Sequence, residues 1–148
     1  MQTKMKLTSP AFISNGKIPE KYTCDGANVH PPLEIFDPPT GSKSFALIVH
    51  DHDAQSGDFV HWLIWNIDPD VRQIMEATTP IGAREGTNDF GKIGWNGPCP
   101  PSGSHRYEFH LYSLSTKLDL PATSAKIDLR ARLLGNIIEE ASLIGVYR

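Results

Sequence analysis

Three runs of apolar, β-branched and aromatic residues constrain the fold of this chain more than any other feature. Residues 44–50 form a near-continuous apolar run that is typical of a buried strand, and residues 60–67 form a second one. Residues 107–114 begin by alternating apolar and polar side chains, which is the pattern of a half-buried strand. We therefore predict a mainly β protein, an antiparallel β-sandwich with helices at its periphery.

One long helix is predicted near the C-terminus, from Leu129 to about Ser142. Its apolar residues recur at helical spacing, with charged residues on the other face. Asp128 is the predicted N-cap and Gly145 the predicted stop. A short helix is predicted over residues 71–77, inside a long Gly-rich connection of the kind that usually carries function or disorder.

Length, charge and hydropathy limit the class of protein. The chain has 148 residues and a formal net charge of −3, so we predict a single domain over residues 1–148 without the basic footprint of a nucleic-acid-binding protein. No stretch approaches the roughly 20 apolar residues of a membrane span, and residues 1–7 lack the apolar core of a secretory signal. We expect a cytoplasmic protein with no nucleic-acid partner and no integral membrane association.

The two cysteines, Cys24 and Cys99, do not have the spacing of a metal-binding motif. Each lies in a turn marked by Gly or Pro, so both could lie near one site. A cytosolic location predicts reduced thiols. A Cys24–Cys99 disulfide is the alternative, because spacing in sequence does not give distance in space.

A Pro- and Gly-rich loop over residues 96–104 leads directly into His105, Arg106 and Tyr107. Proline stiffens such a loop, and glycine lets a ligand approach the backbone closely. Strand alternation places His105 and Tyr107 on one side and Arg106 on the other. We predict that His105 and Tyr107 face an anion pocket and that Arg106 forms a structural ion pair.

Residues 50–53 place four titratable side chains in a row at the end of a predicted buried strand. Such groups are costly to bury unless they are paired. If strand geometry continues, Asp51 and Asp53 share one face and the two histidines share the other. A polar strand end is one interpretation. In the other, the carboxylates orient a protonated His61 or His105, which donates a charge-assisted hydrogen bond to a phosphate oxygen.

Several short segments strengthen the second interpretation through their order along nearly the whole chain. They lie at residues 22–26, 30–33, 51–54, 61–62, 88–91, 97–101 and 105–107. Their order and spacing resemble the phosphatidylethanolamine-binding protein family, in the bacterial and archaeal branch that is similar to Raf kinase inhibitor protein. At residues 51–55 this chain departs from the family's Asp-Pro-Asp-x-Pro motif, because other residues replace both prolines.

The resemblance implies a β-sandwich of antiparallel sheets with a small anion pocket at one end. It implies a binding protein and not an enzyme, without a cofactor or metal, for a small anionic or phosphorylated ligand. A kinase or protease and a second copy of the chain are the implied candidate partners. The implied pocket positions are Asp51, Asp53, His61, Pro100, His105 and Tyr107, with Cys99 at the rim.

Two other functions remain as alternatives. A metal site would draw on imidazole and carboxylate ligands, but their spacing matches no compact motif. A hydrolase would use Ser102 or Ser104 with His105, although the chain has no Gly-x-Ser-x-Gly elbow. The candidate metal ligands are His50, His52, His61, His110, Asp51 and Asp53.

Overall fold

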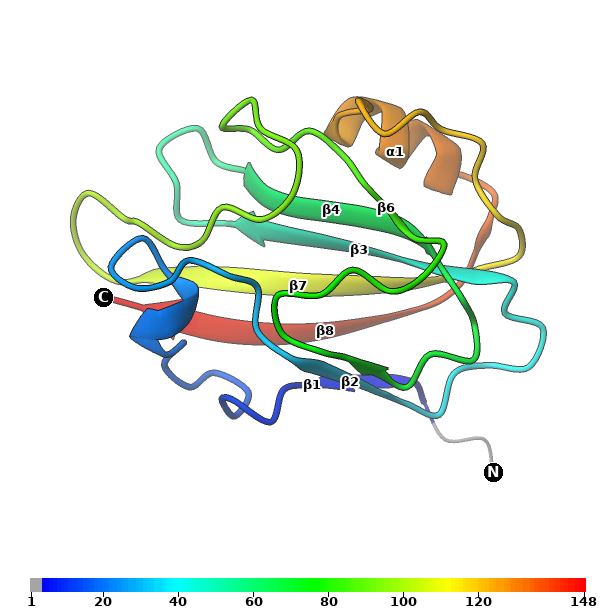
Figure 1. Cartoon of the computed structure of the whole chain (residues 1–148), viewed down its shortest axis with the longest axis horizontal. Helices are drawn as coiled ribbons and strands as arrows, with labels where there is room; N and C mark the ends of the chain where they lie inside the picture. Colours follow the sequence, from blue (N-terminus) through cyan, green and yellow to red (C-terminus); the bar gives the residue numbers. More distant parts are fainter. Residues whose placement is uncertain (1–3) are drawn as a thin grey trace.

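Two antiparallel sheets face each other, which confirms the predicted β-sandwich (Figure 1). The structure is a computed structural model that describes residues 4–148. Residues 1–3, which belong to the predicted domain and to the segment 1–7 without a secretory signal core, lie outside the described residues. The smaller sheet has the order β1 (Lys6–Thr8), β2 (Leu33–Phe36) and β5 (Gln73–Ile74). The larger sheet has the order β6 (Arg84–Glu85), β4 (Phe59–Ile67), β3 (Ser44–Asp51), β7 (His105–Leu114) and β8 (Ile137–Tyr147).

The core has two parts, one on each face of the larger sheet. The main part fills the space between the sheets, where Leu33 and Ile35 of β2 join Val49 of β3 in one buried cluster. The second part lies on the outer face, where Ile48 of β3 packs in one cluster with Leu129 of the helix α1 (Lys126–Leu133). Because both faces of β3 are covered, its sequence is a continuous apolar run without alternation.

The pairing of β3 with β7 decides which polar residues share a face. In this antiparallel register Asp51 lies opposite Tyr107, and His50 lies opposite Glu108. Successive residues of a strand point to opposite faces. Tyr107 belongs to the core between the sheets, so Glu108 lies on the outer face. The polar end of β3 is therefore divided between the two faces of the sheet.

A bulge in β4 changes the direction of His61. The β3–β4 register pairs Val49 with Trp62 and His50 with Val60, so His61 has no direct partner. An extra residue of this kind re-aims side chains near it. Val60 packs in the outer cluster and Trp62 in the inner one, so the bulge lets His61 and Trp62 both lie on the inner side.

The predicted C-terminal helix is wrong over its second half. Helix α1 ends at Leu133, and the chain from Ile137 to Tyr147 forms β8, which pairs with β7 along its length. Gly135 adopts a φ of 80° just beyond the helix end, a left-handed conformation that glycine supplies at helix C-termini. Gly145, the predicted stop, lies inside β8, and Asp128 is not the N-cap but accepts a hydrogen bond from the N-cap Ala125 N–H at 3.0 Å.

The predicted helix over residues 71–77 is also wrong. Residues 73 and 74 form β5, which pairs with Glu34 and Leu33 of β2. Ile74 is buried in the main core, so sheet pairing and burial override the local helical spacing.

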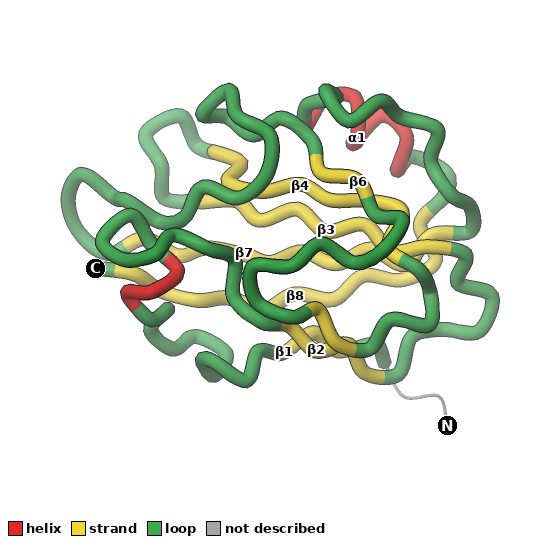
Figure 2. Tube along the Cα trace, in the orientation of Figure 1, coloured by secondary structure: helices red, strands yellow, loops and turns green. Residues whose placement is uncertain are grey.

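Loops make up most of the connection between β4 and β7 (Figure 2). Within residues 4–148 the remaining helical element is the 3-10 turn η1 (Glu20–Tyr22), at a place where the sequence analysis predicted no helix. None of the helices described in residues 4–148 has the length and apolar character that a membrane span requires.

We predict that Gly145→Ala lowers the free energy of unfolding by about 1–3 kcal/mol, the usual cost of overpacking. A Cβ at this position would lie 2.5 Å from Ile18 Cγ1 and 2.8 Å from Phe12 Cε2, so the N-terminal segment would have to shift away from β8. Urea unfolding followed by circular dichroism measures the change. Ile138→Val, at a half-exposed position of the same strand, is the control. Equal stabilities for the two variants would contradict the packing described.

Candidate functional site

A pocket of about 360 Å³ opens at the end of the larger sheet where β3 ends and where β4 and β7 begin. This is the left-hand end of the molecule in Figure 1, near the C-terminus. Its volume is in the range of small-ligand sites. The pocket is lined by Asp51, Asp53, Ala54, Gln55, Phe59, His61, Phe90, Cys99, Pro100, Pro101, Ser102, His105 and Tyr107. All seven residues that the sequence predicted for the site therefore line one cavity.

Asp51 and His105 form a close pair in the wall of this pocket. His105 Nδ1 lies 2.6 Å from Asp51 Oδ2, and both side chains are largely buried. The other carboxylate oxygen of Asp51 accepts the Asp53 backbone N–H at 2.8 Å. The carboxylate therefore fixes the ring and leaves Nε2 as the His105 nitrogen available to a ligand.

Asp53 forms the ion pair that was predicted for Arg106. Asp53 Oδ2 accepts the Arg106 backbone N–H at 2.8 Å and Nε–H at 3.1 Å, and Oδ1 accepts from Nη2 at 3.0 Å. These hydrogen bonds lower the pKa of Asp53 to about 2. Asp53 thus stays ionised and clamps the turn after β3 onto β7.

His61 is not the protonated imidazole that the sequence analysis offered as one of two candidates for a donor to phosphate. The ring is buried, and this burial lowers its pKa below the ordinary 6.5, against the opposing effect of a hydrogen bond to the Asn96 carbonyl. Nδ1 donates to that carbonyl at 2.6 Å. His61 is therefore a neutral imidazole near pH 7, and its second nitrogen is an acceptor.

Tyr107 supplies a phenol that remains protonated. Burial, followed by the charge of Asp51, raises its pKa. Its ring meets the His61 ring edge to face, with centroids 5.3 Å apart. The hydroxyl can therefore donate a hydrogen bond throughout the physiological pH range.

The apolar walls of the pocket were missed in the sequence analysis. Phe59 and Phe90 pack edge to face at 4.8 Å, and each also contacts the His61 ring. Phe90 lies in the segment 88–91 that contributed to the family resemblance, which was the available signal. Trp95 does not line the pocket but packs against Trp62 of the main core, with ring centroids 5.7 Å apart.

Cys24 and Cys99 form a disulfide with a Cα–Cα distance of 5.5 Å. The prediction of reduced thiols is wrong, and the alternative holds. The bond joins the turn after η1 to the Pro-rich loop, and the Cys24 N–H also donates to the Pro98 carbonyl at 3.2 Å. The pocket rim is thus held covalently to the N-terminal part of the chain.

Comparison with known proteins identifies the family of this chain. The family model for phosphatidylethanolamine-binding protein matches residues 8–148. The chain belongs to the phosphatidylethanolamine-binding protein family. A UPF0098 protein of Methanothermobacter thermautotrophicus is 46% identical, with 97% of this chain and 99% of the relative covered. A UPF0098 protein of Pyrococcus horikoshii is 42% identical, with 99% of this chain and 78% of the relative covered.

Two crystal structures of the family extend the likeness to the whole fold. A homologue of phosphatidylethanolamine-binding protein from Chlamydia trachomatis superposes with a TM-score of 0.94 at 38% identity, covering 98% of this chain and 97% of its own. The YbcL protein of E. coli superposes with a TM-score of 0.92 at 30% identity, covering 99% of both chains. The antiparallel architecture is therefore that of the family.

Neither the six ligands considered for a metal site nor the Ser–His pair considered for a hydrolase forms one site within residues 4–148. The six candidate metal ligands do not form one set, because Asp51, Asp53 and His61 line the pocket while the other three histidines do not. For the hydrolase, Ser102 lines the pocket, but within residues 4–148 neither Ser102 nor Ser104 forms a hydrogen bond with His105.

We predict that replacing both cysteines by serine lowers the free energy of unfolding by about 4 kcal/mol. The disulfide closes a loop of 75 residues, and the loss of loop entropy in the unfolded chain predicts a stabilisation of that size. A chain of this length should lose on the order of 10 °C in Tm. Calorimetry of the double variant, beside wild-type protein with and without dithiothreitol, measures the effect. An unchanged Tm would contradict it.

We predict that His61 titrates below pH 6.5 in NMR spectra. Because the folded state binds this proton less readily than the unfolded chain, the unfolded chain takes up more protons as the pH falls below 6.5. The contribution of His61 to stability is therefore complete above this pH and is lost below it. His61→Gln should flatten the fall in stability between pH 7 and pH 5. A His61 midpoint at or above 6.5 would refute the neutral assignment.

Proposed function

We propose that the pocket binds the phosphoryl group of a small phosphorylated molecule. The observation that carries this proposal is the Asp51–His105 pair in the pocket wall, at 2.6 Å. It presents His105 Nε2 to the cavity with its orientation fixed. Tyr107 and Ser102 add hydroxyl donors to the same cavity. Two donors from β7 and one from the loop before it can surround one phosphoryl group.

The two carboxylates of the pocket do not prevent anion binding, because each already has a partner. Asp51 is paired with His105, and Asp53 is held by Arg106 through three hydrogen bonds. Their oxygens are therefore engaged before a ligand arrives. The negative charge that a phosphate meets is reduced accordingly.

The neutral state of His61 selects among anions. Its Nδ1–H is bound to the Asn96 carbonyl, so Nε2 offers a lone pair and not a proton. A phosphate monoester monoanion carries a P–OH that can donate to this nitrogen, whereas sulfate near pH 7 carries no proton. We therefore propose a preference for the protonated phosphoryl group over sulfate.

The apolar walls favour a ligand with a short organic part beside the phosphate. Phe59, Phe90 and Pro101 line the cavity next to the polar groups. The name of the family indicates phosphatidylethanolamine, so phosphorylethanolamine is the natural test compound. Binding without chemical turnover is proposed, which follows the family resemblance.

The remaining predictions concern partners and location. A kinase or protease partner and a second copy of the chain stay predictions that follow from the family resemblance. The cytoplasmic location also stays a prediction, although the reduced thiols expected of a cytosolic chain are replaced by the Cys24–Cys99 disulfide.

We predict that His105→Gln weakens phosphorylethanolamine binding ten- to a hundredfold, because it removes a charge-assisted donor worth about 1.5–3 kcal/mol. Isothermal titration calorimetry at pH 6.5 measures the affinity. NMR chemical shifts should place the ligand near His61 and Tyr107 in wild-type protein.

His110→Gln is the matched control, because His110 lies on the same strand but does not line the pocket. Its affinity for phosphorylethanolamine should equal that of wild type. Sulfate should bind more weakly than inorganic phosphate. If His105→Gln binds as tightly as wild type, or if the shifts lie elsewhere, the proposed site is wrong.

A further inference from the structure

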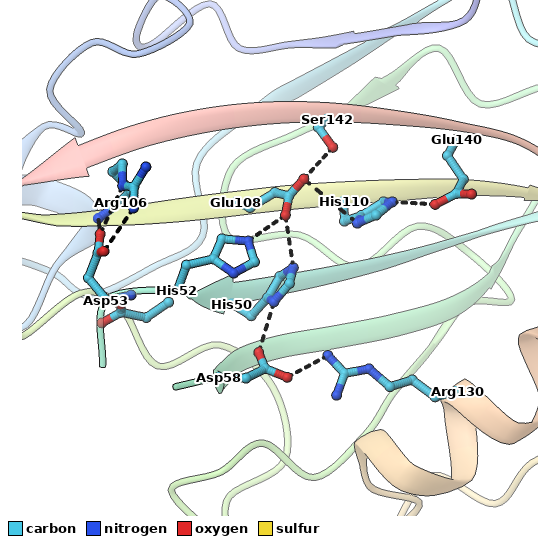
Figure 3. A network of polar contacts seen from close by, with 11 residues as sticks. His50, His52, Asp53, Asp58, Arg106, Glu108, His110, Arg130, Glu140 and Ser142 are labelled. Atoms are coloured by element: carbon cyan, nitrogen blue, oxygen red, sulfur yellow. Dashed lines mark hydrogen bonds and ion pairs between the residues drawn. The ribbon is translucent and has the colours of Figure 1, made fainter. Parts of the chain in front are cut away.

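A second cluster of titratable side chains lies on the outer face of the larger sheet (Figure 3). His50 of β3 and Glu108 of β7 are opposite each other in the register, and His52 follows in the turn after β3. None of these three residues lines the anion pocket. The cluster is therefore separate from the site described above.

Glu108 lies between the two histidines. His52 Nε2 is 2.6 Å from Glu108 Oε1, and His50 Nε2 is 3.3 Å from the same oxygen. One ligand atom from each of the three residues lies within 4.8 Å of the other two. Three donor atoms of the types that bind transition metals thus converge on one point.

The orientation of His50 supports a ligand at this point. Its side chain is only 10% exposed, and its Nδ1 lies 2.9 Å from Asp58 Oδ1. Asp58 is in turn held by Arg130 at 2.9 Å. A carboxylate on one ring nitrogen directs the lone pair of the other nitrogen toward a metal.

The second nitrogen of His50 is buried and unsatisfied. Nε2 has no hydrogen-bond partner within the described part of the chain. When Nδ1 carries the proton and donates it to Asp58, the lone pair of Nε2 faces a carboxylate oxygen of Glu108 at 3.3 Å. Two lone pairs at this distance repel each other, and a cation between them reverses the interaction.

We propose that His50 Nε2, His52 Nε2 and a carboxylate oxygen of Glu108 bind one divalent transition-metal ion of the zinc type. Tetrahedral bonds of about 2.0–2.1 Å place ligand atoms about 3.3 Å apart, which is the present separation of His50 and Glu108. The His52–Glu108 separation must increase by about 0.7 Å. His52 is 41% exposed and lies in a turn, so its ring can move and water can reach the fourth position.

Neighbouring groups already orient the carboxylate. Ser142 Oγ donates to Glu108 Oε2, and His110 Nδ1 lies 3.7 Å from that oxygen. His110 is itself held at Nε2 by Glu140 at 2.7 Å, so it supports the site from outside the three ligands. Two imidazoles with one carboxylate favour zinc and its neighbours over magnesium or calcium, which prefer oxygen ligands.

The test is calorimetric titration of ZnCl₂ into tag-free, metal-stripped protein with its disulfide intact, in a buffer without phosphate. The disulfide prevents Cys24 and Cys99 from acting as thiolate ligands. We expect one zinc per chain, and at least tenfold weaker binding in His52→Gln and in Glu108→Gln. Cobalt should give the visible absorption of a tetrahedral site in wild type but not in these variants.

His105→Gln is the matched control, because it removes a histidine from the anion pocket and leaves the outer cluster intact. It should bind zinc like wild type while binding phosphorylethanolamine ten- to a hundredfold more weakly. His52 is the decisive position, since its exposed side chain can be replaced without disturbing the core. The proposal is overturned if wild type binds no stoichiometric zinc, if folded His52→Gln binds as tightly as wild type, or if His105→Gln loses the metal.

Discussion

The register between β3 and β7 is the constraint on which both sites depend. It sets Asp51 opposite Tyr107 on the inner side and His50 opposite Glu108 on the outer side. Because side chains alternate, a slip of one residue would move each group to the other face. The buried apolar residues of β3 and β7 oppose such a slip, because it would move them out of the inner and outer core clusters in which they pack. Packing of the apolar residues thus fixes the positions of the polar ones.

Loops complete the pocket, and close contacts hold them where strand pairing does not reach. Gly97 N donates to Asn28 Oδ1 at 2.8 Å, beside the Cys24–Cys99 disulfide. A Cβ at Gly97 would lie 2.2 Å from the Tyr22 carbonyl oxygen, so only glycine fits this approach of two backbones. The Pro-rich rim is therefore fixed by a covalent bond, a hydrogen bond and a steric requirement, which together replace the order that a strand would provide.

The sequence was sufficient where local pattern and tertiary packing agree. The runs over β3 and β4 and the alternation in β7 were predictable because burial requires those residues. It failed over residues 137–142, where apolar residues at helical spacing are in fact exposed or half-buried in β8 and the pairing with β7 determines the structure. Gly135 itself was the overlooked signal, because glycine commonly ends a helix in the left-handed conformation that it adopts here. The disulfide depends on a distance in space, and the inward direction of His61 depends on a bulge in β4. Neither can be read from the spacing of residues along the chain.

The turn after β3 shows how one departure from the family pattern serves both faces. Proline in the family motif stiffens this turn, whereas here hydrogen bonds do so: Asp51 accepts the Asp53 N–H, and Asp53 binds Arg106. These hydrogen bonds tie the turn to β7 without a ring at residue 52. Because His52 then carries an imidazole that reaches Glu108, the substitution that removes proline from the pocket's edge also supplies the most exposed member of the outer cluster. A proline at residue 52 would remove that nitrogen and also the hydrogen bond that the His52 N–H donates to the Arg106 carbonyl at 3.4 Å. The imidazole of His52 thus serves the outer face, while the Asp53–Arg106 pair serves the pocket.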